Sequence, residues 1–234
     1  MSDYGEPLWN KYLKRPPSAS DSCAQRGDQI WHFALQSGAS ESSPALSPGC
    51  PLPQDWENRK YAAFDVETTG LDPIRDRIIE IGLVEFEFDR EGALTVTDEF
   101  SALVCPEISI PPAASAIHGL TDDDVAKAPK FKFLAVDLLA KIAGRVVVAH
   151  NASFDLSFLK EELMRAGIEN PIVEWVDSLP LARLAYPNLL SYNLGKAAFA
   201  LGISSGRNHR ALDDATTCMH LFALCARRTS GKCD

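Results

Sequence analysis

The sequence predicts an α/β domain built on a mixed, five-stranded sheet flanked by helices. Segments with the two-residue alternation of strands come first in the folded region, and segments with helical spacing follow them. The run from Val146 to Ala149 is wholly apolar and mostly β-branched, which is typical of a central strand buried on both faces. This order, in which strands come first and helices then alternate with strands, is expected of such a mixed sheet.

The five expected strands are short, apolar or alternating in character, and bounded by turn residues. They are Tyr61 to Val66, Arg77 to Phe88, Leu94 to Val104, Val146 to Ala149 and Ile172 to Val176. The expected helices have apolar residues at helical spacing, and the second follows a capping-box pattern at Thr121 and Asp124. They are Ala113 to His118, Asp122 to Ala126, Lys130 to Ile142, Ser153 to Ala166, Tyr192 to Leu201 and Ala211 to Arg227.

The chain divides into an extension over residues 1–56, a folded domain over 57–228 and a short tail over 229–234. The first part holds seven of the 15 prolines and a serine-rich stretch, with no sustained period apart from a short piece around Ile30 to Leu35. This composition predicts a flexible extension. It is either a disordered tail or an arm that docks a protein partner through exposed aromatic residues. Those aromatic residues are Trp9, Tyr12, Trp31 and Phe33.

The bulk composition excludes several classes of protein. A hydrophobic fraction of 46% and a charged fraction of 24% are those of a globular protein, and no apolar run is long enough to span a membrane. The start of the chain lacks the apolar stretch of a secretory signal. Six cysteines without any CxxC pair argue against a zinc site or a disulfide framework and favour the cytoplasm. Cys218 and Cys225 are expected on one helix face as small apolar fillers.

The net charge of −9 argues, taken alone, against binding to nucleic acid, because phosphate contacts need lysine and arginine. Divalent cations between protein carboxylates and substrate phosphates would remove this objection. The sign of the net charge therefore excludes few functions.

Asp65 and Glu67 stand near the end of the first expected strand. Because residues i and i+2 of a strand point to the same face, their carboxylates project together. Neighbouring carboxylates repel unless a cation lies between them, and oxygen-rich clusters suit Mg²⁺ or Mn²⁺. An Asp-x-Glu pair alone is more often two exposed acids on an edge strand. The apolar lead-in and the Thr-Thr-Gly turn favour a metal site here.

The segment from His150 to Asp155 lies where the valine-rich strand ends and a helix begins. Asp155 falls in the first helical turn, where the helix dipole favours an anion, so a purely structural role is also open to it. Asn151 and Ser153 are plausible helix caps.

His209 precedes the last expected helix, and Asp214 falls within its first turns. Asp213 and Asp214 are about 100° apart around a helix, so they cannot both face one site. The side that bears Asp214 continues into apolar residues, which predicts that Asp214 points inward and that Asp213 is solvated. An inward acid needs a metal or a hydrogen-bond network.

Three motifs of this sequence, taken in order, resemble those of the DEDDh branch of the DnaQ-like exonuclease superfamily. They are Asp65-x-Glu67, His-Asn-x-x-Phe-Asp155 and His209-x-x-x-x-Asp214. The resemblance covers about residues 56–228, and the family includes the proofreading exonuclease subunit of bacterial DNA polymerase III. It implies an RNase H-like fold and metal-dependent 3′→5′ hydrolysis that releases nucleoside 5′-monophosphates.

The resemblance also implies roles for these five residues. Asp65, Glu67 and Asp214 would hold one Mg²⁺ or Mn²⁺ ion. Asp65 would bridge to a second ion, which Asp155 would support directly or through water. His209, with an ordinary pKa near neutrality, would take the proton from the attacking water.

Further matches to the family predict contacts with the 3′-terminal nucleotide. Ile117-His118-Gly119-Leu120 resembles a stretch beside that nucleotide, so His118 is expected either in the substrate pocket or as a helix cap. Thr68, Gly70 and Leu71 match contact positions, although Thr68 could instead close its turn.

Asn151 and Phe154 complete the expected substrate-binding set. Phe154 would stack near a base or, alternatively, belong to the core. Glu80, His150 and His220 are expected to be structural.

The expected partner is a single-stranded 3′ end of DNA or RNA, bound over a few nucleotides. The alternatives are a non-catalytic RNase H-like interaction subunit and a proofreading subunit that acts only within a polymerase complex. An RNase H-like endonuclease or nucleotidyl transferase fits the order of the motifs less well. Extra residues at the N-terminal side, without a clamp-binding motif, favour a free-standing enzyme or one recruited through residues 1–56.

Overall fold

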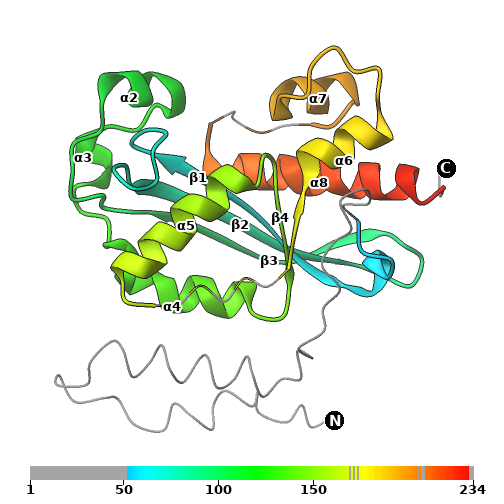
Figure 1. Ribbon diagram of the computed structural model, residues 1–234, viewed down its shortest axis with the longest axis horizontal. Helices are drawn as coiled ribbons and strands as arrows, with labels where there is room; N and C mark the ends of the chain where they lie inside the picture. The colour runs from blue at the N-terminus through cyan, green and yellow to red at the C-terminus, as the bar shows by residue number, and fades with distance from the viewer. Residues whose placement is uncertain are drawn as a thin grey trace, which may run out of the picture.

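A computed structural model describes residues 52–168, 170, 172, 174–204, 206 and 209–231 (Figure 1). The expected flexible extension, its aromatic arm and its short ordered piece lie outside these residues, apart from residues 52–56. The strands are β1 (Lys60–Thr68), β2 (Ile78–Phe88), β3 (Leu94–Leu103), β4 (Val146–Ala149) and β5 (Trp175–Asp177). The helices are η2 (Trp56–Asn58), α2 (Pro112–His118), α3 (Asp122–Val125), α4 (Phe131–Ile142), α5 (Ser153–Arg165), α6 (Ser178–Ala185), α7 (Leu194–Ala200) and α8 (Ala211–Thr229).

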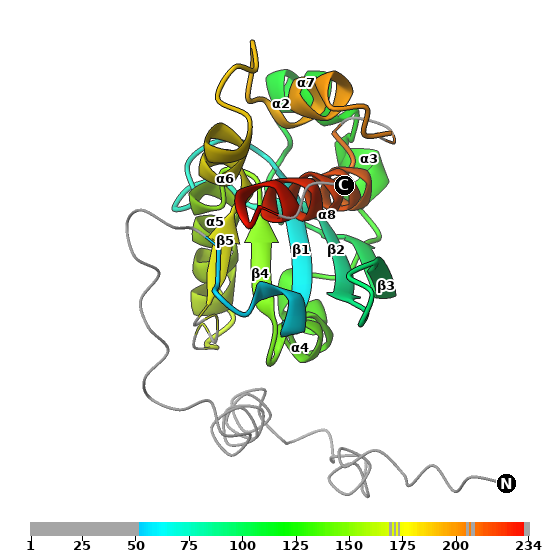
Figure 2. The ribbon, with the colours of Figure 1, turned by 90° about the vertical axis from the view of Figure 1, so that its right-hand side faces the viewer.

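The five strands form one mixed sheet in the order β3-β2-β1-β4-β5, which confirms the predicted fold class (Figure 2). β1, β2 and β3 pair antiparallel as a meander, and β4 and β5 run parallel to β1. All four residues of β4 are buried, as expected for a strand covered on both faces. In the register of β1 and β2, Asp65 lies opposite Gly82 and Glu67 lies opposite Glu80.

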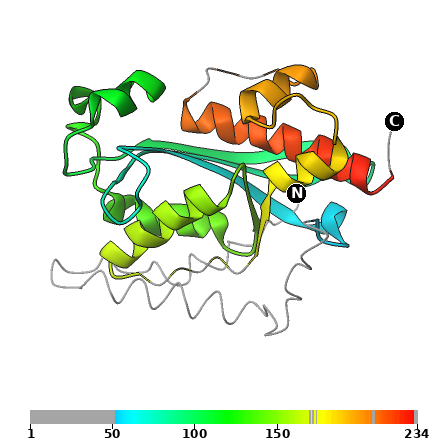
Figure 3. The same ribbon diagram turned by 45° about the horizontal axis from the view of Figure 1, so that its top comes forward.

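Helices cover both faces of the sheet, so the molecule has three layers. Figure 3 shows the orange and red helices α7 and α8 on one side of the sheet and the yellow-green α5 on the other. Odd-numbered residues of β1, such as Tyr61 and Ala63, pack with α6, α7 and α8. Even-numbered residues, such as Phe64 and Val66, pack with α4 and α5. Asp65 and Glu67 are odd-numbered and therefore point to the side of α8.

Helix α6 was not predicted, and the strand before it was placed too early. The structure has β5 at Trp175–Asp177 rather than from Ile172 to Val176. Asp177 ends β5 and caps α6, because its side chain accepts a hydrogen bond from the backbone N–H of Leu179. Pro180 resembles a helix breaker in the sequence, but it occupies the first turn of α6, where proline is tolerated.

Other boundaries agree with the sequence to within one or two residues. α7 begins after the cap residue Asn193 instead of at Tyr192, and α8 extends to Thr229. The capping box before α3 is confirmed, since the backbone N–H of Thr121 donates to Asp124 Oδ2 at 2.8 Å. No helix in the described part of the chain is both long and apolar enough to cross a membrane.

Two residues on the extension side of the expected boundary at 56/57 pack into the core. Leu52 and Trp56 are buried against the α8 side of the sheet. The Trp56 ring makes an edge contact with Phe88 at 4.8 Å, and the Tyr61 hydroxyl donates to the Trp56 carbonyl oxygen at 2.6 Å. Burying an aromatic side chain stabilises a core by about 2 kcal/mol, so these residues contribute to the fold of the domain.

Candidate active site

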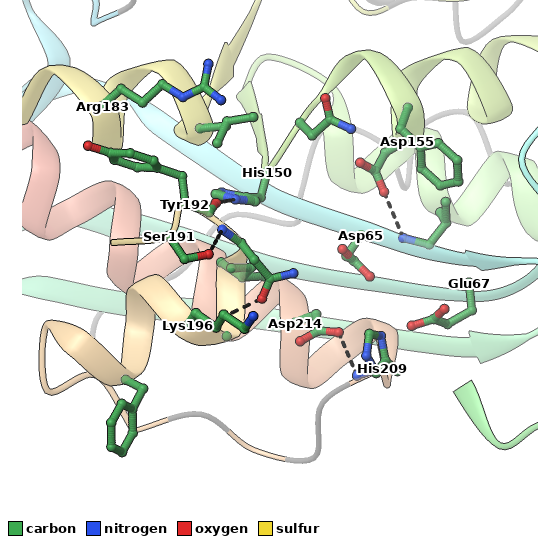
Figure 4. Close-up of a pocket in the computed structure, with 18 of the residues that line it drawn as sticks. Asp65, Glu67, His150, Asp155, Arg183, Ser191, Tyr192, Lys196, His209 and Asp214 are labelled. Atoms are coloured by element: carbon green, nitrogen blue, oxygen red, sulfur yellow. Dashed lines mark hydrogen bonds between the residues drawn. The ribbon is translucent and has the colours of Figure 1, made fainter. Parts of the chain in front are cut away.

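The structure brings Asp65, Glu67, Asp155, His209 and Asp214 to one cavity of about 1140 Å³ (Figure 4). They come from three places far apart in the sequence. Asp65 and Glu67 are near the end of β1, Asp155 is in the first turn of α5, and Asp214 is in the first turn of α8. Ligand atoms of Glu67, His209 and Asp214 all lie within 4.8 Å of one another. The three motifs therefore meet in one place, and we call the four carboxylates of Asp65, Glu67, Asp155 and Asp214 the acidic cluster.

Asp155 is fixed beside the end of β1. Its side chain is 3% exposed, and its Oδ1 accepts a hydrogen bond from the backbone N–H of Val66 at 3.2 Å. The turn before α5 passes through Asn151 with a positive φ of 64°. Asn151 donates its backbone N–H to Asp177 Oδ1 at 2.9 Å. The cap of α6 thus also holds the turn that leads to Asp155.

The start of α8 is fixed by an ion pair that the sequence did not reveal. Glu80 is 2% exposed, and both of its carboxylate oxygens accept hydrogen bonds from Arg210 at 2.6–3.1 Å. Glu80 Oε2 also accepts the backbone N–H of Ala211 at 3.1 Å, the first residue of the helix. Glu80 was expected to be structural, and the structure identifies its partner. Because the charge of Arg210 is paired with Glu80, it offsets the raised pKa of Glu67 only in part.

His209 and Asp214 are held close to each other at this helix start. His209 has a positive φ of 60°, and its backbone N–H donates to Asp214 Oδ2 at 2.9 Å. Helix α8 lies against the sheet here because Gly82 has no side chain. A Cβ on Gly82 would lie 2.1 Å from the carbonyl carbon of Ala211, far inside van der Waals contact.

Burial and mutual repulsion raise the pKa values of all four carboxyl groups. Burial raises the pKa of Asp65 well above its ordinary value, and Asp155, Asp214 and Glu67 add to the rise. The pKa of Glu67 rises to about 8, mainly through burial and then through Asp214. Burial likewise raises the pKa of Asp155 to about 7 and that of Asp214 above its ordinary range. Four such groups share one cavity at neutral pH only at a cost in free energy, which a bound cation would remove.

The donor set therefore suits hard divalent cations such as Mg²⁺ or Mn²⁺, which prefer carboxylate oxygens. Among the described residues, Glu67, His209 and Asp214 form a group compatible with an ion. His209 thus has two possible roles, as a base beside the ions or as a nitrogen ligand to one of them.

The residues expected to bind the terminal nucleotide are only partly in the cavity. Asn151 and Phe154 line it, and Phe154 also packs against Phe158 at 5.0 Å between ring centroids. The other four expected contacts are not among the described residues of the lining. These are Thr68, Gly70, Leu71 and His118.

His118 has the capping role that was the alternative for it. It is the last residue of α2, and its Nδ1 accepts a hydrogen bond from the backbone N–H of Leu120 at 3.1 Å. Its Nε2 is buried.

Sequence reasoning missed a second group of cavity residues, on α6, on α7 and between them. Arg183, Tyr192 and Lys196 line the cavity on the side of α6 and α7 (Figure 4). His150, expected to be structural, both lines the cavity and binds Tyr192. No short motif contains these residues, so only the fold brings them together.

A model of the RNase_T exonuclease family matches residues 62–222. The chain belongs to this exonuclease family. The family match contains all five residues of the candidate site, and the DnaQ-like resemblance seen in the motifs is confirmed at the level of the family.

Individual relatives agree with this assignment. Over 175 residues the chain is 41% identical to the DNA polymerase III subunit epsilon of Treponema pallidum, covering 72% of this chain and 79% of the relative. It is 35% identical over 177 residues to the PolC-type DNA polymerase III of Clostridium perfringens, covering 75% of this chain and 12% of that protein. Exonuclease X in complex with 5′ overhanging duplex DNA aligns with a TM-score of 0.54 at 26% identity, over 73% of this chain and 93% of that one.

Proposed function

We propose that the chain is a 3′→5′ exonuclease of the DEDDh type, which hydrolyses the terminal phosphodiester of single-stranded DNA or RNA. The observation that carries the proposal is the convergence of Asp65, Glu67, Asp155, Asp214 and His209 in one cavity. Four carboxylates can hold divalent cations, and an adjacent histidine can accept a proton, which are the functions that metal-assisted phosphodiester hydrolysis uses.

The reaction adds water to the terminal phosphodiester. The water oxygen bonds to phosphorus, the bond from phosphorus to the upstream 3′ oxygen breaks, and that oxygen takes up a proton. The products are a nucleoside 5′-monophosphate and a strand shortened by one nucleotide with a new 3′ hydroxyl.

The four carboxylates would hold two Mg²⁺ or Mn²⁺ ions, which when bound supply charge stabilisation for the attacking and leaving oxygens. His209 is exposed and lies at the edge of the acidic cluster, so its ring can reach a water at the mouth of the cavity. It accepts the proton of the attacking water. The hydrogen bond from its backbone to Asp214 keeps it beside the cluster.

The test is release of mononucleotides from 3′-labelled single strands of DNA and of RNA with Mg²⁺ or Mn²⁺. Strands blocked at the 3′ end are the controls. Asp214→Asn should abolish release, and His209→Ala should lower kcat by about 10²–10⁴-fold, the usual contribution of a general base. If His209 is a metal ligand instead, His209→Ala will act mainly on the metal concentration needed for half-maximal rate. No release from either polymer by the wild-type protein would disprove the proposal.

A role as a proofreading subunit is a second candidate, favoured by the 41% identity to a polymerase III epsilon subunit. In that role the enzyme would act on the primer end within a polymerase complex, in the cytoplasm. Residues 1–56 are the proposed contact with a protein partner. Faster excision of a mismatched primer terminus in the presence of a replicative polymerase would support this candidate, and equal rates would exclude it.

A further inference from the structure

The cavity extends well beyond the acidic cluster, toward α6 and α7. Among the residues that line that side, we select five with cationic, aromatic or exposed apolar side chains and call them the basic wall. They are Arg183, Leu190, Tyr192, Lys196 and Phe199. Figure 4 shows Arg183, Tyr192 and Lys196 across the cavity from Glu67 and Asp155.

The basic wall contains two cations that form no ion pair within the described part of the chain. Arg183 and Lys196 are exposed, and no carboxylate of the described residues forms an ion pair with either of them. By contrast, Arg210 beside the acidic cluster is paired with Glu80. In a chain of net charge −9, two uncompensated cations on one side of a cavity make a local attraction for anions.

Exposed apolar groups stand between and beside these cations. Phe199 is 87% exposed and Leu190 is fully exposed, although both line the cavity. The guanidinium of Arg183 lies over the ring of Tyr192 at 5.6 Å from its centroid. Cations next to open aromatic faces are typical of surfaces that bind single-stranded nucleic acid, where phosphates pair with the cations and bases stack on the rings.

Hydrogen bonds from His150, and within the loop between α6 and α7, hold Tyr192 of the basic wall. His150 Nε2 lies 2.8 Å from the Tyr192 carbonyl oxygen, and because a carbonyl only accepts, this nitrogen carries the proton. His150 Nδ1 then accepts from the Ser178 hydroxyl at 2.8 Å. The Tyr192 hydroxyl donates to the Tyr186 carbonyl oxygen at 2.9 Å. These hydrogen bonds attach the loop between α6 and α7 to the end of β4 and to α6.

We infer that the basic wall binds the nucleotides upstream of the scissile bond in a single-stranded polynucleotide. This inference rests on the proposed function, because the acidic cluster defines where the 3′ end lies. The cavity of about 1140 Å³ exceeds the usual range for a single small ligand, roughly 300–1,000 Å³, so it has room for more than the terminal nucleotide.

The occupant is a single strand rather than a duplex. Stacking on Phe199 requires a base with an uncovered face, and in a duplex each base face is covered by its neighbours. The contacts to phosphate and to base faces carry no sequence information, so the basic wall binds any sequence.

The test compares kcat/KM on a dinucleotide and on an octanucleotide, as single-stranded DNA and as single-stranded RNA. The variants are Arg183→Ala, Lys196→Ala and Phe199→Ala. Lys132→Ala and Phe133→Ala are matched controls, because they remove an exposed cation and an exposed aromatic ring on α4, outside the cavity. Binding of the octanucleotide to Asp214→Asn protein, followed by fluorescence anisotropy over a range of salt concentrations, gives a measure that does not depend on hydrolysis.

The wild-type enzyme should prefer the octanucleotide. Each variant of the basic wall should lower its kcat/KM on the octanucleotide roughly tenfold and leave the dinucleotide unaffected. Loss of either cation should also reduce the salt slope of binding by about 0.7, the value for one phosphate of a single strand. An effect with only one polymer identifies that polymer as the substrate.

Three results would overturn the inference while the proposed function stands. The first is an equal wild-type kcat/KM on the dinucleotide and the octanucleotide. The second is a basic-wall variant with the same kcat/KM as the controls Lys132→Ala and Phe133→Ala. The third is a variant that loses the same factor in kcat/KM on both lengths. An enzyme that cuts neither length refutes the proposed function itself.

Discussion

Gly82→Ala tests whether the position of helix α8 sets the rate of the reaction. Gly82 lies opposite Asp65 in the sheet and beneath the first residues of α8. An added Cβ would lie 2.1 Å from the carbonyl carbon of Ala211 and 2.3 Å from the backbone nitrogen of Leu212. These are backbone atoms, so no side-chain rotation can relieve the contact.

The size of the effect follows from these distances. The start of α8 must retreat by about 1 Å or more before Ala211 reaches ordinary contact at 3.4 Å. Asp214 is in the first turn of this helix and His209 comes just before it, so both would move away from Asp65. A misplacement of about 1 Å can lower a rate about 10²-fold. Overpacking should also lower the free energy of unfolding by about 1–3 kcal/mol.

The assay measures kcat on a single-stranded oligonucleotide at saturating Mg²⁺, together with urea unfolding. The control is Leu138→Ala, which removes a buried side chain in α4 on the other face of the sheet and should cost about 2–5 kcal/mol. Below its unfolding transition this control should keep the wild-type kcat. The reasoning is wrong if Gly82→Ala keeps kcat within about twofold of wild type, or if Leu138→Ala loses as much kcat as Gly82→Ala.

Three further predictions concern charge and stability. Asp65→Asn should raise the melting temperature in EDTA while abolishing hydrolysis, because burial and then repulsion from Asp155, Asp214 and Glu67 raise the pKa of Asp65. A lower melting temperature would contradict this. In EDTA the melting temperature should fall as pH rises from about 5 to 8, since Glu67 and Asp155, with pKa values of about 8 and about 7, bind more protons folded than unfolded. Mg²⁺ should flatten this slope, and a profile that is flat in EDTA argues against the cluster. Glu162→Gln should lower the free energy of unfolding by about 3 kcal/mol in urea, because Glu162 is 1% exposed and pairs with Arg77 at 2.6 Å. Glu107→Gln, in an exposed pair with Lys130, should change little, and equal losses would mean that burial is not the cause.

Much of the acidic cluster could be predicted because its parts follow from local geometry. The two-residue period of a strand puts Asp65 and Glu67 on one face, and the structure has both on the side of α8. Helical geometry separates Asp213 from Asp214 in the same way. The strand and helix boundaries around these residues also depend on short-range patterns, which explains why most were predicted closely.

The remaining features depend on contacts between distant residues. Glu80 and Arg210 are 130 positions apart, and nothing in the sequence near Glu80 indicates its partner. Helix α6 was missed because Pro180 is compatible with a helix only in its first turn. The side chain of Asp177 caps this helix and also accepts a hydrogen bond from the backbone of Asn151, which is distant in the sequence. Contacts between residues so far apart in the sequence cannot be predicted from local sequence patterns, because they form only in the folded chain.

The basic wall explains how a chain of net charge −9 can bind a polyanion. The carboxylates of Asp65 and Glu67 repel phosphate unless cations lie between, so affinity at the 3′ end depends on metal. Arg183 and Lys196 attract phosphate without any metal. The two sides of the cavity thus have different roles. The basic wall supplies affinity by binding the upstream nucleotides, and the metal-dependent acidic cluster positions the phosphodiester bond that is cut. A net charge averaged over the chain conceals this division, since the sign of the potential changes across a single cavity.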